Sequence, residues 1–120
     1  RRCHFVVHEN QRLLDGCRHL SKNELREFGK LMFETQEGLS KWYEVSCPES
    51  DFLSAEAKTF SGVIGARQMG GGFGGCVINI VREDVIDDFS FFIKKKYKNK
   101  FNKVPEIYVT QIEDGAHVVK

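Results

Sequence analysis

Residues 70 to 75 read Gly-Gly-Gly-Phe-Gly-Gly, and they separate two strand-like segments, residues 63–69 (VIGARQM) and 76–81 (CVINIV). These six positions contain five of the eleven glycines in the chain. Because glycine loses more conformational freedom on folding than any other residue, such a cluster carries an entropic cost, and it is typical of a loop with positive φ angles or close ligand approach. Consecutive N–H groups in such a loop can surround an anion, so the stretch predicts a β-hairpin whose turn binds phosphate.

Helical patterns precede this hairpin. Ser21 followed by Glu24 has the pattern of a capping box, so a second helix is expected to begin there. Pro48 suits the first turn of a third helix, with Ser46 as its cap and its end near Phe60. The first helix is expected over residues 2–20, where apolar side chains three and four positions apart predict one apolar stripe. That stripe consists of Cys3, Val6, Val7, Leu13, Leu14, Cys17 and Leu20.

The residues after the hairpin predict one more helix and a second hairpin. An amphipathic pattern begins near Asp84, and its basic last turns suit a solvated helix C-terminus. Residues 105–112 and 117–119 have strand-like patterns on either side of Asp114-Gly115, which is a strong turn signal. Three helices followed by β-β-α-β-β predict an α+β domain, with helices packed on one face of a four-stranded antiparallel sheet.

The length and composition are typical of a single globular domain. The chain has 120 residues, of which 41% are hydrophobic and 29% charged, and its formal net charge is +1. This balance predicts no nucleic-acid partner, and the basic stretch after residue 93 is interpreted as a solvated helix end. No apolar run approaches the ~18 residues of a membrane span, so no membrane partner is predicted. Because the first residue is Arg1, a cut or processed product, or a piece of a longer protein, is expected.

The cysteines and histidines suggest no disulfide framework and no metal site. Four cysteines are spread widely and form no C-x-x-C pair, which predicts reduced, mostly buried thiols in a cytoplasmic protein. His4 and His8 are spaced to share a metal ion on one helix face, but a third ligand is lacking nearby. The cysteines are Cys3, Cys17, Cys47 and Cys76.

The pattern G-x-G-x-x-G formed by Gly70, Gly72 and Gly75 occurs in several phosphate-binding loops. A dinucleotide site requires a helix after the glycines, whereas a strand-like segment follows here. A protein-kinase loop would also match Val77, but the V-A-I-K lysine and the H-R-D and D-F-G motifs are absent. A Walker loop needs G-K-S or G-K-T, which is absent as well. A glycine-rich hairpin without any ligand remains the alternative.

Three longer segments resemble one known family. Residues 65–76 (GARQMGGGFGGC) resemble the third signature motif of the GHMP kinases, most closely the galactokinase form G-A-R-M-T-G-G-G-F-G-G-C. Residues 43–49 (YEVSCPE) are similar to the galactokinase segment Y/F-E-V-S-C-P-E, and residues 8–14 (HENQRLL) to its E-N-x-R-V-L helix. The ending, from Pro105 to Ala116, also resembles that family. The resemblance covers nearly the whole chain and keeps the motifs in order.

The resemblance implies that residues 1–120 form the ferredoxin-like C-terminal domain of a GHMP kinase. In that family an N-terminal domain carries the acidic sugar-binding signature, the P-x-x-x-G-L-S-S-S loop and the aspartate beside the sugar hydroxyl, and none of these occurs here. The implied activity is phosphorylation of galactose at its anomeric hydroxyl. ATP and Mg²⁺ would be held mainly by the N-terminal domain, so no catalytic residue and no activity are expected in this chain alone.

Two questions remain open from the sequence. The sugar can be galactose or a relative such as N-acetylgalactosamine, because the residues that select it would lie upstream. The alternative function is a stand-alone regulatory module that binds a nucleotide or a sugar phosphate, or docks to a partner.

The resemblance also places the glycine loop at the cleft between the two domains, near the nucleotide phosphates. Phe73 is expected to anchor the loop against apolar neighbours or to be part of the core. Arg67 can contact an anion bidentately or pair with a carboxylate of its own domain. Two departures from the family stand out: Gln68-Met69 replaces the usual Met-Thr, and Gln36 replaces a frequent histidine and cannot titrate. The residues expected at the phosphates are Gly70, Gly71, Gly72, Phe73, Gly74 and Gly75.

Overall fold

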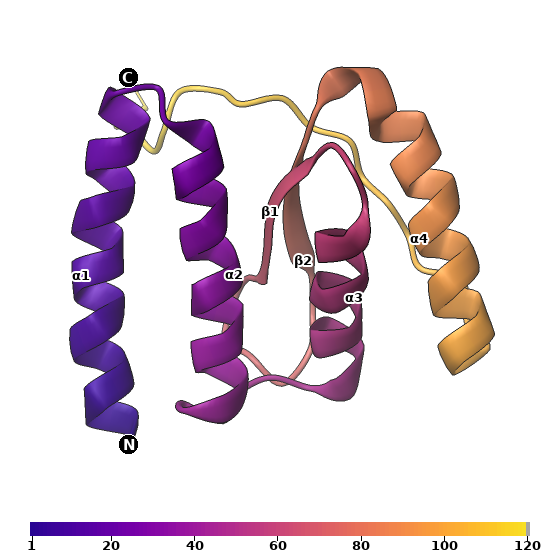
Figure 1. The fold of residues 1–120 in the computed structure, drawn as a ribbon, viewed down its shortest axis with the longest axis horizontal. Helices are drawn as coiled ribbons and strands as arrows, with labels where there is room; N and C mark the ends of the chain where they lie inside the picture. Colours follow the sequence, from indigo (N-terminus) through magenta and orange to yellow (C-terminus); the bar gives the residue numbers. More distant parts are fainter. Residues whose placement is uncertain (120) are drawn as a thin grey trace.

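The computed structural model describes residues 1–119, and these form an α+β fold, as the sequence predicts (Figure 1). The glycine loop and the linker between the second and third helices lie at one end of the molecule, together with the N-terminus. The C-terminal segment runs past the last helix and over the opposite end. The elements in chain order are α1 (Arg2–Ser21), α2 (Leu25–Lys41), α3 (Pro48–Thr59), β1 (Val63–Gln68), β2 (Val77–Val81), the 3-10 helix η1 (Glu83–Val85) and α4 (Ile86–Phe101).

The β1–β2 hairpin is present where the sequence predicts it. The strands are antiparallel and pair from Val63 opposite Val81 to Gln68 opposite Val77, with an irregularity around Ile64. Beyond the last pair, the Met69 N–H donates to the Cys76 carbonyl oxygen at 3.0 Å, so pairing continues to the edge of the glycine loop. The hairpin therefore fixes the positions of both ends of the loop.

The helices lie on both sides of this hairpin and not on one face, so the predicted one-sided packing is wrong. Successive strand residues point to opposite faces. A Cβ atom placed on Gly65 would point toward Gly29 and Met32 of α2. The next residue, Ala66, lies in a core with Ala57 of α3. Helix α2 therefore covers one side of β1, while α3 and α4 cover the other.

Helix α2 and strand β1 approach each other backbone to backbone. A Cβ atom placed on Gly29 would lie 1.9 Å from the Ile64 carbonyl oxygen. A Cβ atom placed on Gly65 would lie 2.8 Å from the Gly29 Cα atom. Only residues without side chains fit at these two positions, because close-packed interiors leave no space for an extra methyl group.

The main core lies between α3, α4 and one face of the hairpin. Phe60, which follows α3, stacks on α4 with its ring centroid 5.3 Å from that of Phe89 and 5.0 Å from that of Phe92. The two alanines of the core have no exposed surface, which lets α3 lie close to β1. The buried members of this core are Ala57, Ala66, Phe89 and Ile93.

A smaller contact joins α1 to α2. Phe5 is only 6% exposed, and its ring lies 5.1 Å from the ring of Tyr43. Gly38 makes room for this ring, since a Cβ atom there would lie 2.6 Å from Phe5 Cε2. Helix α1 therefore packs against the rest of the fold with only two buried residues, Phe5 and Gly16.

The four-stranded sheet is not confirmed, because residues 102–119 contain no strand. The predicted second hairpin around Asp114 and Gly115 is absent from the described residues, and Ile112 is 94% exposed. One cause is that the outer edge of β1 is already occupied: the Gln68 N–H donates to the Gln36 side-chain oxygen of α2 at 2.7 Å. A two-stranded hairpin that packs against nothing is marginal in water.

The predicted helix caps are partly wrong. Ser21 belongs to the last turn of α1 and donates to the Arg18 carbonyl oxygen, so it does not cap α2, which Glu24 precedes. Pro48 does begin α3, as predicted, but Cys47 and not Ser46 is the residue before it. A cap pattern in the sequence fits several neighbouring residues, and the contacts of Ser46 with other parts of the fold decide which of them precedes the helix.

None of the helices in residues 1–119 is both long and apolar enough to cross a membrane.

Candidate functional site

The glycine loop, residues 70–75, has a backbone that few other residues adopt. Phe73 has a positive φ angle of 60°, although it is not a glycine. With the glycines included, five of the six loop residues lie in the region that L-residues avoid, which explains why the composition is so one-sided. The glycines with positive φ are Gly70 (89°), Gly72 (96°), Gly74 (138°) and Gly75 (94°).

The loop is docked on the linker between α2 and α3. The Phe73 N–H donates to the Val45 carbonyl oxygen at 2.6 Å. Gly72 lies against the same group, since a Cβ atom there would be 2.6 Å from that oxygen. Gly72 therefore requires glycine for two reasons, its φ angle and this close approach.

The other side of the loop is open. Gly71 has no positive φ angle, and a Cβ atom on Gly70, Gly71 or Gly74 would meet no atom within 4 Å. Within residues 1–119, no protein acceptor binds the N–H groups of the five loop glycines. A row of unhindered N–H groups facing open space can bind an anion.

Phe73 does not have the role expected from the sequence. Its side chain is 73% exposed, so neither the apolar anchor nor the core position is correct. The residue holds the loop through its backbone N–H and leaves its ring in solvent.

A polar network beneath the loop ties α2, the linker and α3 together. Asp51 accepts three hydrogen bonds: from Gln36 Nε2 at 2.9 Å, from Ser40 Oγ at 2.8 Å and from Ser46 Oγ at 2.7 Å. Gln36 is 5% exposed. A half-buried carboxylate that accepts three bonds is a strong local constraint, because bonds to charged groups are stronger than neutral ones.

The network reaches the loop through Gln68. Gln36 Oε1 accepts from the Gln68 N–H, and Gln68 Nε2 donates to the Val45 carbonyl oxygen at 3.2 Å. That carbonyl is the one that also holds Phe73. The two positions that depart from the family pattern, 36 and 68, are therefore in direct contact. Gln68 is 2% exposed and its Oε1 atom has no partner, so this side chain is fixed by burial and by one bond.

Arg67 does not join the glycine loop. Its Nε donates to the Gln68 carbonyl oxygen at 2.9 Å, and its Nη1 lies 4.0 Å from Glu9 Oε1 of α1. The same Glu9 carboxylate accepts from Arg12 at 2.8 Å and from Thr35 at 2.9 Å. Of the two roles expected for Arg67, this geometry favours contacts within the chain over a contact with an anion.

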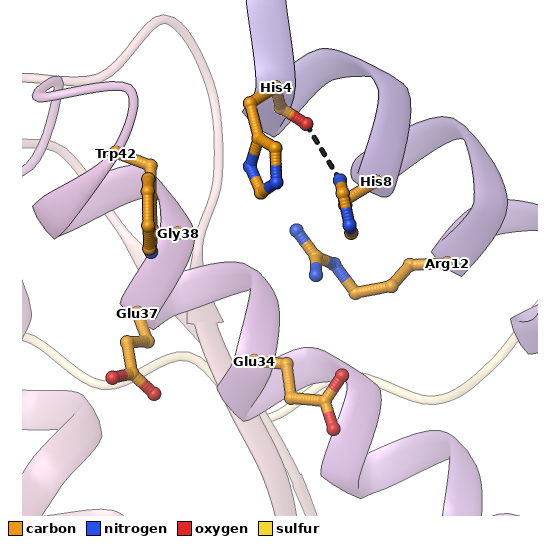
Figure 2. Close-up of a pocket in the computed structure, with 7 residues that line it drawn as sticks. All are labelled: His4, His8, Arg12, Glu34, Glu37, Gly38 and Trp42. Carbon is orange, nitrogen blue, oxygen red and sulfur yellow. Dashed lines mark hydrogen bonds between the residues drawn. The ribbon is translucent and has the colours of Figure 1, made fainter. Parts of the chain in front are cut away.

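A groove between α1 and α2 gathers several other polar side chains (Figure 2). The His4 and His8 rings stack with centroids 4.0 Å apart, and the Trp42 ring lies 5.2 Å from that of His4. Arg12 points into the same groove, and Glu34 and Glu37 lie across it on α2. The described residues contain no group of three potential metal ligands, here or elsewhere.

The cysteines are less buried than predicted. All four have free thiols; Cys3, Cys17 and Cys76 are exposed, and Cys47 is half-buried. Cys47 donates to Ser50 Oγ at 3.3 Å at the start of α3. The expectation of buried thiols fails because two of them lie on the outward side of α1 and one at the open end of the hairpin.

Residues 14–99, more than two thirds of the chain, match the family model for the C-terminal part of GHMP kinases. The chain belongs to the GHMP kinase family. This GHMP kinase segment contains the whole glycine loop, the hairpin and the polar network, so the site just described is part of the family domain.

The relatives of this GHMP kinase chain are galactokinases. It is 46% identical over 116 residues to a galactokinase of Clostridium acetobutylicum, a match that covers 97% of this chain and 30% of that protein. It is 39% identical over 120 residues to a galactokinase of Bacillus subtilis, covering 100% of this chain and 31% of that protein. The chain therefore spans about 30% of the length of these relatives.

A solved structure has the same fold. The crystal structure of Lactococcus lactis galactokinase complexed with galactose superimposes with a TM-score of 0.88 at 33% identity, covering 92% of this chain and 29% of that one.

The sequence predicts the position of the loop but not its two supports, the Val45 carbonyl group and Asp51. Val45 lies inside the YEVSCPE segment, so the motif itself was the available signal.

Proposed function

We propose that this chain is the C-terminal lobe of an ATP-dependent galactokinase, which transfers the γ-phosphoryl group of ATP to the anomeric hydroxyl of galactose. The observation that carries the proposal is the glycine loop, whose N–H groups lack protein acceptors and whose position is fixed from below by Val45. The galactokinase relatives, one of them complexed with galactose, support the choice of reaction and sugar. The family, not the isolated loop, distinguishes this function from a glycine-rich hairpin without a ligand.

The role proposed for the loop is to bind and position phosphate. ATP supplies the group that is transferred, and catalysis of such a transfer depends on positioning and on stabilising negative charge. The N–H groups of Gly70, Gly71 and Gly74 suit this task, because they have no acceptor in the described chain and a Cβ atom on these residues would meet no atom within 4 Å. The docking of Phe73 on Val45 keeps these donors in place.

We assign the Mg²⁺ ligands, the catalytic residues and the sugar-binding residues to a further, N-terminal domain of the same protein, because this chain matches the C-terminal part of the family and covers only about 30% of its galactokinase relatives. That domain is proposed as the partner of this chain, and the chain alone is expected to be inactive. A cytoplasmic location is part of the proposal, supported by four unpaired cysteines.

The test is a kinase assay on the protein encoded by the complete gene that contains this chain. We expect phosphorylation of galactose that depends on ATP and Mg²⁺. Replacing Gly71 with alanine is expected to lower kcat/KM at least tenfold, about 1.4 kcal/mol in transition-state free energy. The melting temperature should not change, because the added methyl group meets no protein atom within 4 Å.

The matched control is Gly16→Ala, the same change in α1 and away from the loop, which should leave kcat/KM unaltered. Equal activity of the Gly71→Ala variant and the unmodified protein would contradict the phosphate role of the loop. If the gene encodes no kinase signature and the product phosphorylates no sugar, the alternative applies, a regulatory module that binds a nucleotide or a sugar phosphate.

We also propose that residues 105–119 add strands to the hairpin in the complete protein, giving the four-stranded ferredoxin-like sheet. The alternating apolar residues Ile107 and Val109 are exposed here, 36% and 64%. Within this segment the Tyr108 hydroxyl donates to the Glu106 carboxylate, and this hydrogen bond raises the pKa of Tyr108.

Amide hydrogen exchange tests this completed sheet. Residues 107–112 are expected to exchange at least a hundredfold more slowly in the complete protein than in the chain alone, because strand pairing protects N–H groups from water. Residues 97–100 of α4 are the internal reference, since they are helical without the added strands. Equally fast exchange of residues 107–112 in both preparations would refute the completed sheet.

A further inference from the structure

Helix α1 exposes its apolar side and packs against the fold with its polar side. We call the exposed set the outer stripe of α1, and its five largest members are between 42% and 67% exposed. At ~100° per residue the stripe covers about 140° of the helix surface and runs for about 26 Å along it. The stripe consists of Cys3, Val6, Val7, Leu13, Leu14, Cys17 and Leu20.

The side of α1 that faces α2 has a different composition. It contributes only Phe5 and Gly16 as buried residues. Glu9 and Arg12, bonded to each other at 2.8 Å, are half-buried beside them. A surface helix normally turns its apolar stripe toward the core and its charges toward water. Helix α1 reverses this order, so the surface for which its apolar residues are suited is not provided by α2.

No element of the described chain lies on the outer side of α1, which is the outermost helix on the left in Figure 1. An apolar strip of this size on a small protein, interrupted in its middle by Asn10, marks a contact surface and is not an ordinary feature of a monomer surface. The core of the chain is also small, with six buried hydrophobic residues among those described. The fold is thus incomplete on this side.

We propose that the outer stripe of α1 is covered in the complete protein by a part of the same polypeptide that lies outside these 120 residues. The inference rests on the proposed function, because it takes this chain to be one lobe of a longer kinase. The matched relatives are about three times as long as this chain. The three matches described above include 92–100% of this chain but only 29–31% of each relative. The apolar stripe makes α1 an interior helix of that larger protein.

Two other occupants fit the stripe less well. A second copy of α1 would place Asn10, in the middle of the stripe, against its own equivalent and leave the wide apolar arc only partly covered. An anionic membrane would require basic residues along both flanks of the stripe. One flank has Arg18, which is paired with Asp15, and the neutral Gln11, and the other has Arg2 and the acidic Glu9. A wide apolar face with flanking charges of both signs favours an intramolecular protein partner.

The cysteines of the stripe provide the first test. Cys3 and Cys17 are alkylated with N-ethylmaleimide in the chain alone and in the protein from the complete gene, and each site is followed by mass spectrometry. Both thiols are expected to react at least tenfold more slowly in the complete protein. The control is a cysteine placed at Lys98, which is exposed on α4 and away from α1, and which should react equally fast in both preparations. Unprotected Cys3 and Cys17 in the complete protein would refute the proposal.

A charge on the stripe provides the second test, because its effect on the melting temperature should differ between the two preparations. Leu14→Glu is expected to lower the melting temperature of the complete protein by several degrees, and to leave the melting temperature of the chain alone unchanged while reducing its self-association. Gln11→Glu, on the same helix, should be neutral in both. A loss of stability in the chain alone, or stripe thiols protected there in a concentration-dependent way, would overturn the proposal in favour of a second copy.

The outcome is independent of the kinase assay. Protected stripe cysteines in a complete protein that phosphorylates no sugar would refute the proposed function and leave the buried stripe intact. Reactive stripe cysteines in an active galactokinase would refute the buried stripe alone. A complete gene that encodes no further residues would overturn both.

Discussion

Replacing Gly29 with alanine is expected to destabilise this protein by at least about 3 kcal/mol, more than any other single methyl group added to its helices. The new Cβ atom would lie 1.9 Å from the Ile64 carbonyl oxygen and 2.6 Å from its carbonyl carbon. These are backbone atoms of β1, so no side-chain rotation can relieve the overlap, and α2 must move away from the strand. Urea denaturation followed by circular dichroism measures the change, and the melting temperature should fall by roughly 10 °C or more.

Gly16→Ala is the matched control for this prediction. Its Cβ atom would lie 3.2 Å from Phe28 Cε2, which is the edge of a side chain that can shift by a few tenths of an ångström. Alanine also favours a helix interior over glycine by about 1 kcal/mol. The variant should therefore remain within about 1 kcal/mol of the unmodified protein. Equal destabilisation by both substitutions would show that helix glycines matter in general and that the α2–β1 contact has no special role.

Replacing Asp51 with alanine is expected to cost about 3 kcal/mol and to loosen the glycine loop. The carboxylate accepts bonds from Gln36, Ser40 and Ser46, and its removal leaves those donors under-satisfied beneath the surface. An unpaired buried polar group costs about 1–3 kcal/mol. Because Gln36 also holds the backbone of Gln68, the disturbance should reach the end of β1 and then the loop.

The readout specific to the loop is the amide exchange of Phe73, whose N–H is bonded to Val45. Its exchange rate is expected to rise about tenfold relative to that of Arg82, whose N–H bonds to the Gly62 carbonyl oxygen at the other end of the hairpin. Asp15→Ala is the control, since that carboxylate binds only Gln11 and Arg18 near the surface of α1, and such pairs are worth at most about 1 kcal/mol. An unchanged ratio for Asp51→Ala would mean that the network supports the helices but not the loop.

The local parts of the fold were predictable because their causes lie close together in the chain. The hairpin and its glycine loop follow from two strand-like segments around a run of glycines, and five of the six loop residues do have positive φ angles. Pro48 at the first turn of α3 is likewise a local effect, since proline has no N–H to donate. The start of α2 was mispredicted, because a serine near a helix junction can cap one helix or end the other.

The glycine loop and the family motifs were also accessible from the sequence, but their supports were not. Gln36 and Gln68 are 32 residues apart, and nothing in their local patterns indicates that one bonds to the other. The second hairpin near the C-terminus failed for the same reason: a strand forms only when another backbone is available to pair with it. The isolated pattern of residues 105–119 contains no information on that partner.

The sequence by itself determined the helices, the hairpin, the open glycine loop and membership of the GHMP kinases, because periodicity, turn chemistry and motif order are properties of adjacent residues. Only the tertiary structure decided which face of each helix is buried. It places Gly29 against Ile64 and the loop on Val45, and it turns the apolar side of α1 outward. The physical reason is that burial depends on which surfaces meet across the fold, and an amphipathic pattern specifies an apolar face without specifying what covers it.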